Sequence, residues 1–446
     1  MAALLCAGPS VSQIASNVTF HSKLDQHGEY ADIWGYTAPD GREYALLGSQ
    51  TGLVVVNVTN RIFPYETEYF PDVFSIWRDI KTYDHYAYVV NESSGGLAIF
   101  DLSDPENPQS VGTYNGFSTA HNLYIEEATA RCYIAGSDLS TGGIRVLSLA
   151  NPTAPVSIGS WEVEYAHDVV SLDHRLYVSA IFDERLHVLD ATTPNGIVTL
   201  GSVGNYPLAF THNAWMTADN QFVMTTDETE GASCRMWDVS NPASITQTDA
   251  YRPVATSIPH NTHIRDDFAY ISHYSIGVRV VDISDPHDIT EAGFYDTYPP
   301  DNGDGYDGCW GVYPFFPNSP GLMVASDITG GLYVLEFTGA LPTSTPQIDV
   351  APTALVLGAP APNPARSGQV AAMELSVPAR TRVHAHVVDV TGRRVATVAD
   401  RELEPGSYDL HWDGRDSAGS AVGAGVYFVK VVTDLGERSR KIQIVR

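Results

Sequence analysis

The sequence lacks any run of 18 or more apolar residues, so it predicts no transmembrane helix. Basic residues are also scarce, with 25 Lys and Arg against 53 Asp and Glu and a net charge of −28. Residues 340–446 contain 12 basic and 11 acidic residues, so the negative excess lies on the preceding part of the chain. Because an acidic surface repels nucleic acid and anionic membranes, neither is an expected partner. This excess of acidic residues fits either an acidic solvated surface or a cation-binding surface.

Cysteine is equally rare, and its spacing carries no pattern. The four residues Cys6, Cys132, Cys234 and Cys309 form no C-x-x-C pair, which argues against a zinc knuckle, a redox motif or a disulfide framework. No G-x-S-x-G, H-E-x-x-H, Walker A or G-x-G-x-x-G motif occurs. Nothing therefore identifies a nucleophile, and the sequence favours a non-catalytic role.

The N-terminal segment, residues 1–16, is apolar and rich in small residues, like the end of a signal peptide. It has no basic n-region, and Cys6 follows Leu5 instead of the small residue that a lipobox requires. We interpret it as a residual signal-like segment, which indicates a secreted or cell-surface protein.

One apolar strand pattern recurs seven times in the middle of the chain. Its copies begin at Gly52, Gly96, Gly143, Arg185, Cys234, Gly277 and Gly331. The spacing from start to start is 44, 47, 42, 49, 43 and 54 residues. This is the period of a four-stranded propeller blade. The Asp-Pro or Asn-Pro that ends most copies is a turn signal.

Alternating apolar runs flank each copy and supply the other strands of a blade. The last copy has no following strand, but residues 17–24 carry a matching run. Because closure removes exposed strand edges, we expect these residues to complete the last blade. The prediction for residues 17–339 is an all-β, seven-bladed β-propeller closed by its N-terminal strand.

The last part of the chain predicts a second domain. Residues 340–356 are rich in Pro, Thr and Ala and are typical of a linker. Residues 357–446 contain short alternating strands separated by Gly, Asp and Asn turns, which predicts a small β-sandwich. The segments starting at Pro362, Asp389, Trp412 and Gly425 resemble the FlgD-type immunoglobulin-like domain. That resemblance, which extends to type IX secretion sorting domains, implies export and anchoring without catalysis.

The repeat copies, with the consensus G-x-x-V-x-D-[VI]-[ST]-[DN]-P, resemble LVIVD-repeat proteins. The segments that start at Asp32, Trp77, Ala120, Ala166 and Thr211 make the chain similar to the choice-of-anchor B family over about residues 17–338. The resemblance implies an exported bacterial propeller with a variable C-terminal anchor and no assigned activity. The chain departs from the pattern at Arg185 and Cys234, which replace the expected Gly.

The first strands of the blades predict the candidate site, because they line the axis of a propeller. Aligning them gives a first column of Trp34, Arg78, His121, His167, His212, His260 and Trp310, and a second of Gly35, Asp79, Asn122, Asp168, Asn213, Asn261 and Gly311. The ends of the second strands add polar residues that include Asp227, Glu228 and His273. We expect these residues to form an acidic, histidine-rich funnel at one mouth of the axis.

Three interpretations of this funnel stay open. His121, His167, His212 and His260 are candidate ligands for a divalent metal such as Zn, because neutral imidazoles bind such ions. The same residues could contact a ligand directly, or they could hydrogen-bond neighbouring blades in register. The loop from Asp301 is a weak calcium candidate, since its acids fall at positions 1, 4 and 7 and not at the spacing of an EF-hand.

The functional prediction is therefore a secreted or cell-surface bacterial binding module. Its expected partner is a protein, a glycan or a cell-wall component, bound through the histidine-rich face. One alternative is a structural subunit of an extracellular assembly, in which the chain associates with itself. The other is a metal-dependent hydrolase or lyase that uses the histidine funnel.

Overall fold

The computed structural model describes residues 14–299, 303, 305–339, 355–360, 362–366, 370–403, 406–412, 414–417 and 420–445. The chain divides into two compact units, Met1–Pro342 and Thr343–Arg446. Residues 1–13 of the signal-like segment, residues 340–354 of the linker, and Asp301, Asn302 and Asp304 of the acidic loop lie outside the described residues. Among the helices that are described, none has the length and apolar character needed to cross a membrane.

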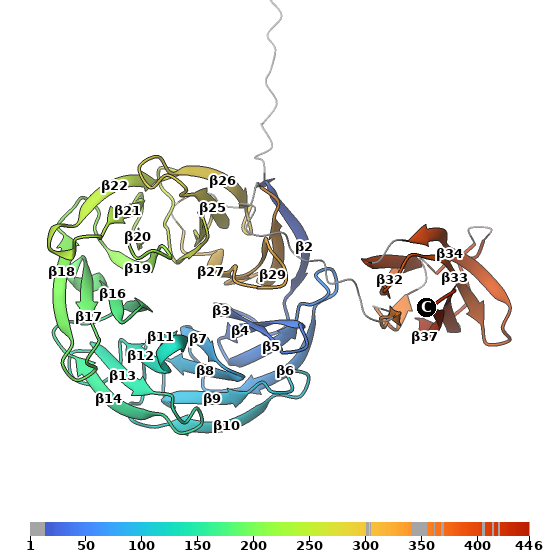
Figure 1. The fold of residues 1–446 in the computed structure, drawn as a ribbon, viewed down its shortest axis with the longest axis horizontal. Coiled ribbons are helices and arrows are strands. Elements are labelled where there is room, and N and C mark those ends of the chain that lie inside the picture. Colours follow the sequence, from blue (N-terminus) through green and yellow to red (C-terminus); the bar gives the residue numbers. More distant parts are fainter. Residues whose placement is uncertain are drawn as a thin grey trace, which may run out of the picture. The chain divides into compact units, whose positions relative to one another are not determined.

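The described residues of the first unit form seven antiparallel sheets around a common axis (Figure 1). The first two sheets consist of β3 (Tyr30–Thr37), β4 (Glu43–Ser49), β5 (Gly52–Asn57) and β6 (Tyr65–Pro71), then β7 (Arg78–Tyr83), β8 (Tyr86–Asn91), β9 (Leu97–Asp101) and β10 (Gln109–Tyr114). The third and fourth consist of β11 (Asn122–Glu126), β12 (Arg131–Ala135), β13 (Ile144–Ser148) and β14 (Val156–Trp161), then β15 (Asp168–Leu172), β16 (Arg175–Ala180), β17 (Arg185–Asp190) and β18 (Val198–Gly204).

The remaining sheets continue the same order of strands. The fifth and sixth consist of β19 (Thr211–Met216), β20 (Phe222–Asp227), β21 (Cys234–Asp238) and β22 (Thr246–Tyr251), then β23 (Thr262–Arg265), β24 (Phe268–Ser272), β25 (Val278–Asp282), β26 (Thr290–Tyr295) and β1 (Ala15–Ser16). The seventh consists of β27 (Cys309–Tyr313), β28 (Leu322–Asp327), β29 (Gly331–Phe337) and β2 (Val18–Leu24). Three short 3-10 helices are also described, η1 (Glu127–Thr129), η2 (Ile181–Asp183) and η3 (Pro242–Ser244). The predicted all-β class is confirmed, and six of these seven sheets have the predicted four strands, while β1 adds a fifth strand to the sixth sheet.

The N-terminal strand joins the two ends of the first unit. β2 pairs antiparallel with β29, with Val18 opposite Phe337 and Leu24 opposite Leu332. β1 extends the preceding sheet by pairing with β26. Asn17 between them donates its side-chain amide to the Ala292 carbonyl at 2.7 Å. Residues far apart in the sequence therefore cover the outer edges of two adjacent sheets.

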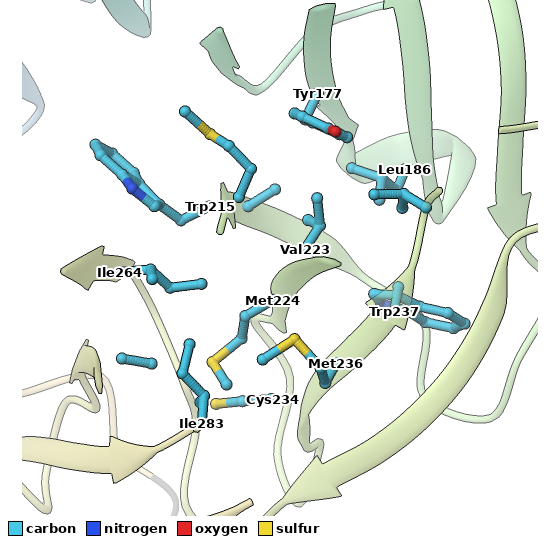
Figure 2. Close-up of a cluster of buried hydrophobic side chains, with 14 of the residues drawn as sticks. Tyr177, Leu186, Trp215, Val223, Met224, Cys234, Met236, Trp237, Ile264 and Ile283 are labelled. Atoms are coloured by element: carbon cyan, nitrogen blue, oxygen red, sulfur yellow. The ribbon is translucent and has the colours of Figure 1, made fainter. Parts of the chain in front are cut away.

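Buried side chains fill the space between neighbouring sheets. Figure 2 shows one such cluster, in which Tyr177 and Leu186 lie near Val223 and Trp237 of the next sheet. A buried tyrosine recurs on the second strand of several sheets and also links them by its hydroxyl. Tyr88 donates to the Pro152 carbonyl at 2.9 Å and Tyr177 to the Asn220 side chain at 2.9 Å. Because burial drives this packing and these hydroxyl groups are satisfied, the sheets hold the axis-lining strands firmly in place.

The described residues of the second unit form a separate two-sheet sandwich. One sheet contains β30 (Val356–Leu357), β32 (Ala371–Val377) and β35 (Gly406–Trp412). The other contains β31 (Ala365–Arg366), β33 (Thr381–Asp389), β34 (Arg394–Leu403), β36 (Gly425–Thr433) and β37 (Gly436–Val445). Trp412, Val387 and Val429 belong to a core of its own. This arrangement fits the predicted immunoglobulin-like domain.

Candidate functional site

The first strands of the seven sheets place three layers of side chains around the axis. Their pairing with the second strands fixes which positions correspond. The first layer is Ala31, Arg78, His121, His167, His212, His260 and Trp310; the second is Asp32, Asp79, Asn122, Asp168, Asn213, Asn261 and Gly311; the third is Trp34, Lys81, Tyr124, Val170, Trp215, His263 and Tyr313.

The first layer brings the four predicted histidines together. The ring centroids of His121 and His167 lie 3.9 Å apart, those of His167 and His212 4.4 Å, and those of His212 and His260 4.3 Å. Trp310 continues the arc at 4.7 Å from His260. The four imidazoles therefore form one contiguous arc at one mouth of the axis, which we call the histidine arc.

Hydrogen bonds orient the imidazoles of the histidine arc. His212 Nδ1 lies 3.2 Å from the His260 carbonyl, and His260 Nδ1 lies 2.5 Å from the Trp310 carbonyl. Since a carbonyl only accepts, each Nδ1 carries the proton and each Nε2 keeps its lone pair. His121 Nδ1 lies 2.6 Å from Glu92 Oε1. These bonds also join three pairs of neighbouring sheets, as the structural interpretation expects.

Burial favours the neutral form of His167, His212 and His260. Loss of solvation, followed by repulsion from His121, His212 and His260, lowers the pKa of His167 well below its usual value. Burial likewise lowers the pKa of His212, against the attraction of Glu228, and lowers the pKa of His260 strongly. Neutral imidazoles are the form that binds metal ions.

The second layer is a hydrogen-bonded girdle. Asn122 donates its amide to the carboxylates of Asp79 and Asp168 on the two neighbouring sheets. Asn213 donates to Asp168 at 2.9 Å and accepts from the Thr262 backbone at 2.9 Å. The predicted site residues of this layer therefore join sheets. Burial raises the pKa of Asp168 to about 7.

Four residues of the predicted funnel do not lie as expected. Trp34 belongs to the third layer and not to the histidine arc, because the pairing of β3 with β4 places Ala31 and Asp32 in the first two layers. Gly35 therefore leaves the second layer too. Asp227 has no exposed surface, and its carboxylate accepts from Phe210 N, Tyr206 and Arg235. His273 is also completely buried.

Other predicted residues do reach the mouth of the axis that holds the histidine arc. Arg78 is fixed there, because its guanidinium donates to the Ser49 carbonyl, the Asp72 carboxylate and the Val73 carbonyl. Arg78, Asp79, Asn122, Asp168, Asn261 and Trp310 line a cavity of about 30 Å³ together with three histidines of the arc. Glu228 contacts the arc directly, as its Oε2 lies 3.7 Å from His212 Nε2.

The sequence did not predict a second pocket, which lies at the opposite mouth of the axis. Its volume is about 730 Å³, and aromatic side chains of the third layer and the residues beyond it line it. The ring centroids of Trp215 and Phe315 are stacked 5.4 Å apart, and those of Trp34 and Tyr313 lie 5.0 Å apart. We call this the aromatic pocket. The available signal was an aromatic residue two positions after the Asn or Asp of three first strands, namely Trp34, Tyr124 and Trp215.

Gly35 is required by the wall of the aromatic pocket. A Cβ atom at this position would lie 2.0 Å from the ring of Tyr313. The glycine lets the Tyr313 ring pack against β3, where it also contacts Trp34. Close backbone approach thus sets the shape of this wall.

Charged groups surround the aromatic rings. Lys81 lies at the base of the pocket, with its ammonium 4.5 Å from the centroid of the Trp34 ring. Asp84, Glu127, Asp173 and His174 lie among the residues that line the pocket. Burial raises the pKa of Glu127. The rim is therefore predominantly acidic, while the wall is apolar.

Glu126 anchors one side of the aromatic pocket. Its carboxylate accepts hydrogen bonds from Ser171 Oγ at 2.9 Å, the His174 backbone N–H at 2.8 Å and Thr129 Oγ1 at 2.5 Å. Burial opposes ionisation, but these bonds outweigh it and lower the pKa of Glu126. Because the pKa is lowered on folding, the stabilisation is present above the unfolded pKa and is lost as pH falls through the folded pKa.

We therefore expect Glu126→Gln to lower the free energy of unfolding by about 2 kcal/mol at pH 7. The difference should shrink as the pH falls below about 4, where the wild-type carboxyl is protonated as well. Denaturant unfolding at pH 7 and at a pH below about 4 measures this difference in the free energy of unfolding. Glu127→Gln, which changes an exposed carboxyl group, is the control. An equal loss at both pH values would contradict the role assigned to the carboxylate.

Comparisons with known proteins identify both parts of the chain. A model of the LVIVD repeat matches residues 77–116 and 260–297. A model of the FlgD Ig-like domain matches residues 364–437. No curated protein matches with significance. The chain thus contains LVIVD repeats followed by a FlgD Ig-like domain, as the sequence predicted.

Two solved structures align with the chain, and one of them is similar in fold. The hydrazine synthase of Kuenenia stuttgartiensis aligns with a TM-score of 0.54 and 13% identity over 72% of this chain and 98% of that chain. PorZ, an essential surface component of the type IX secretion system of Porphyromonas gingivalis, aligns with a TM-score of 0.48 and 12% identity. That alignment covers 94% of this chain and 60% of the PorZ chain. Likeness at this level of identity concerns the fold alone.

Proposed function

We propose that this chain is a secreted or cell-surface bacterial propeller that binds a neutral glycan in its aromatic pocket without transforming it. The seven sheets act as seven blades, closed by β2, in a member of the choice-of-anchor B family. Residues 17–339 form the propeller, 340–356 the linker and 357–446 the sorting or anchoring domain. The LVIVD and FlgD Ig-like matches support this organisation, because the first falls within residues 17–339 and the second within residues 357–446.

The observation that carries the proposal is the aromatic pocket itself. Its volume of about 730 Å³ lies within the range of small-molecule sites, whereas the cavity at the histidine arc measures about 30 Å³. The rigid first strands hold Trp34, Tyr124 and Trp215 around this volume. We therefore place the ligand at this mouth, opposite the face that the sequence indicated.

The chemistry of the wall and rim favours a sugar. The C–H faces of a sugar ring are apolar and stack on aromatic rings, while its hydroxyl groups need polar partners at the edge. Trp34 and Phe315 offer such rings, and Thr82, Glu127 and Asp84 offer polar groups nearby. The acidic rim disfavours an anionic glycan, because like charges repel.

Calorimetric titration tests this function. We expect the full chain to bind at least one member of a panel of neutral oligosaccharides, which includes chitin and glucan oligomers. Trp34→Leu should weaken that binding at least tenfold, because it removes one wall of the pocket. Trp77→Ala is the matched control, since this indole is 37% exposed and lines the cavity at the other mouth.

Two results would contradict the proposal. One is that wild type and Trp34→Leu bind the oligosaccharide equally while Trp77→Ala does not bind it. The binding site would then lie at the histidine arc. The other is binding of tetramethylammonium but of no oligosaccharide, which would identify the pocket as an aromatic cage for an organic cation. Thermal unfolding of each variant checks that the substitution leaves the protein folded.

A further inference from the structure

At the mouth of the axis that holds the histidine arc, Glu228 lies close to His212 and His260. Hydrogen bonding alone does not explain this arrangement. One ligand atom from each of the three lies within 4.8 Å of the others. His212 and His260 are 4% and 2% exposed, so water does not solvate their rings freely. The group lies opposite the aromatic pocket, and it is independent of the function proposed above.

The protonation of the two imidazoles follows from their partners. Both Nδ1 atoms face backbone carbonyls, of His260 and of Trp310, so both carry protons. Both rings are buried, and in a neutral imidazole with a proton on Nδ1 the Nε2 atom is the one that binds metal. Each Nε2 therefore presents a lone pair and no proton.

Glu228 then creates an unsatisfied contact. Its Oε2 lies 3.7 Å from His212 Nε2, which is too long for a hydrogen bond and which brings two lone-pair acceptors face to face. Its other oxygen, Oε1, accepts from the Tyr274 hydroxyl at 2.5 Å, so the carboxylate is held in this orientation. A cation between the two atoms would turn this repulsion into attraction.

We propose that His212 Nε2, His260 Nε2 and a carboxylate oxygen of Glu228 bind a divalent transition-metal ion, of which zinc is the best representative. Two imidazoles and one carboxylate are a known zinc ligand set. The carbonyls that accept from Nδ1 and the hydroxyl that donates to Glu228 supply the outer hydrogen bonds that orient metal ligands. The hard ions Mg²⁺ and Ca²⁺ prefer all-oxygen sites and fit less well.

The surroundings leave room for a further ligand. His212 and His260 also line the cavity of about 30 Å³, which exceeds the space that one water molecule needs. An ion at this site can therefore keep a water molecule as its fourth ligand. His121 and His167 continue the arc beyond His212, and His121, His167 and His212 form a second group within the same 4.8 Å limit. That group is the competing location for the ion.

Titration of the metal-stripped full chain with zinc chloride, followed by elemental analysis after gel filtration, tests the assignment. We expect one tightly held zinc per chain and a higher melting temperature with zinc. Glu228→Gln should weaken binding at least tenfold, because it keeps the size of the side chain and removes its charge. His260→Ala should abolish tight binding, while His287→Ala, which removes an exposed imidazole, should leave it unchanged.

Cobalt provides a second readout that does not depend on stability. Co²⁺ bound to two imidazoles and a carboxylate should show visible absorption, which Glu228→Gln should alter. Absence of zinc binding by the wild type would overturn the proposal, as would wild-type affinity in both Glu228→Gln and His260→Ala. Loss of binding only in His121→Ala and His167→Ala would also overturn it, because the ion would then belong to the competing group.

Discussion

Replacing Lys81 with methionine is expected to lower the free energy of unfolding by about 3–5 kcal/mol, the cost of breaking a buried ion pair from one side. The ammonium of Lys81 contacts the carboxylate of Asp79 and lies 3.4 Å from that of Asp32. All three side chains are at most 8% exposed. Methionine preserves most of the volume, so the loss measures charge and not packing.

The pKa values show why the effect is large. Burial alone would lower the pKa of Lys81, but Asp79 and Asp32 outweigh it and raise the value to about 12. Burial raises the pKa of Asp32 well above its ordinary value even with Lys81 present. Without the Lys81 ammonium, Asp32 and Asp79 of the second layer would lose the cation beside them, and these carboxylates would have to take up protons or repel one another.

Denaturant unfolding of Lys81→Met at pH 7 measures this effect, and Lys23→Met, which removes an exposed ammonium, is the control. Adding Asp79→Asn to Lys81→Met should recover part of the loss, because it removes one unpaired charge. A loss below about 1 kcal/mol in Lys81→Met would show that Lys81 is not the counter-charge of the girdle.

Removal of the chain up to Leu24 is expected to have the second large effect. It uncovers the whole edge of β29 and removes the Asn17 carbonyl that accepts from Thr338 N–H at 2.8 Å. It also removes the contact from Ser22 Oγ to the Arg61 carbonyl at 2.5 Å, which reaches the first sheet. Because an open ring exposes two sheet edges, we expect a loss of several kcal/mol and strong aggregation.

Thermal unfolding and light scattering measure the result of this deletion. The matched control is the removal of residues 343–446, which form a compact unit of their own, and it should leave the melting of the first unit nearly unchanged. An N-terminal deletion that stays monomeric with an unchanged melting temperature would show that β2 does not close the ring.

The repeats made most of the fold predictable. The spacing of the apolar copies located the third strand of each sheet, and the missing last strand led to residues 17–24, which do pair with β29. The histidine arc was also predictable, since His-Asn or His-Asp recurs in four consecutive first strands at one register.

The errors have physical causes. Trp34-Gly35 was aligned with the identical pair Trp310-Gly311, but strand pairing places Ala31, three positions before Trp34, in the layer of Trp310. Asp227 and His273 end second strands, and the sequence does not show that the side chains turn inward there. The aromatic pocket escaped prediction because its residues come from several first strands whose aromatic positions look like ordinary core.

The ligand that occupies the aromatic pocket decides the proposed function most directly. A crystal structure of the full chain, grown with the tightest-binding neutral oligosaccharide, tests this in one measurement. The prediction is a sugar ring packed against the aromatic side chains of Trp34 and Phe315, with its hydroxyl groups toward Glu127 and Thr82. An empty aromatic pocket with sugar density at the histidine arc, or elsewhere on the protein, would contradict it.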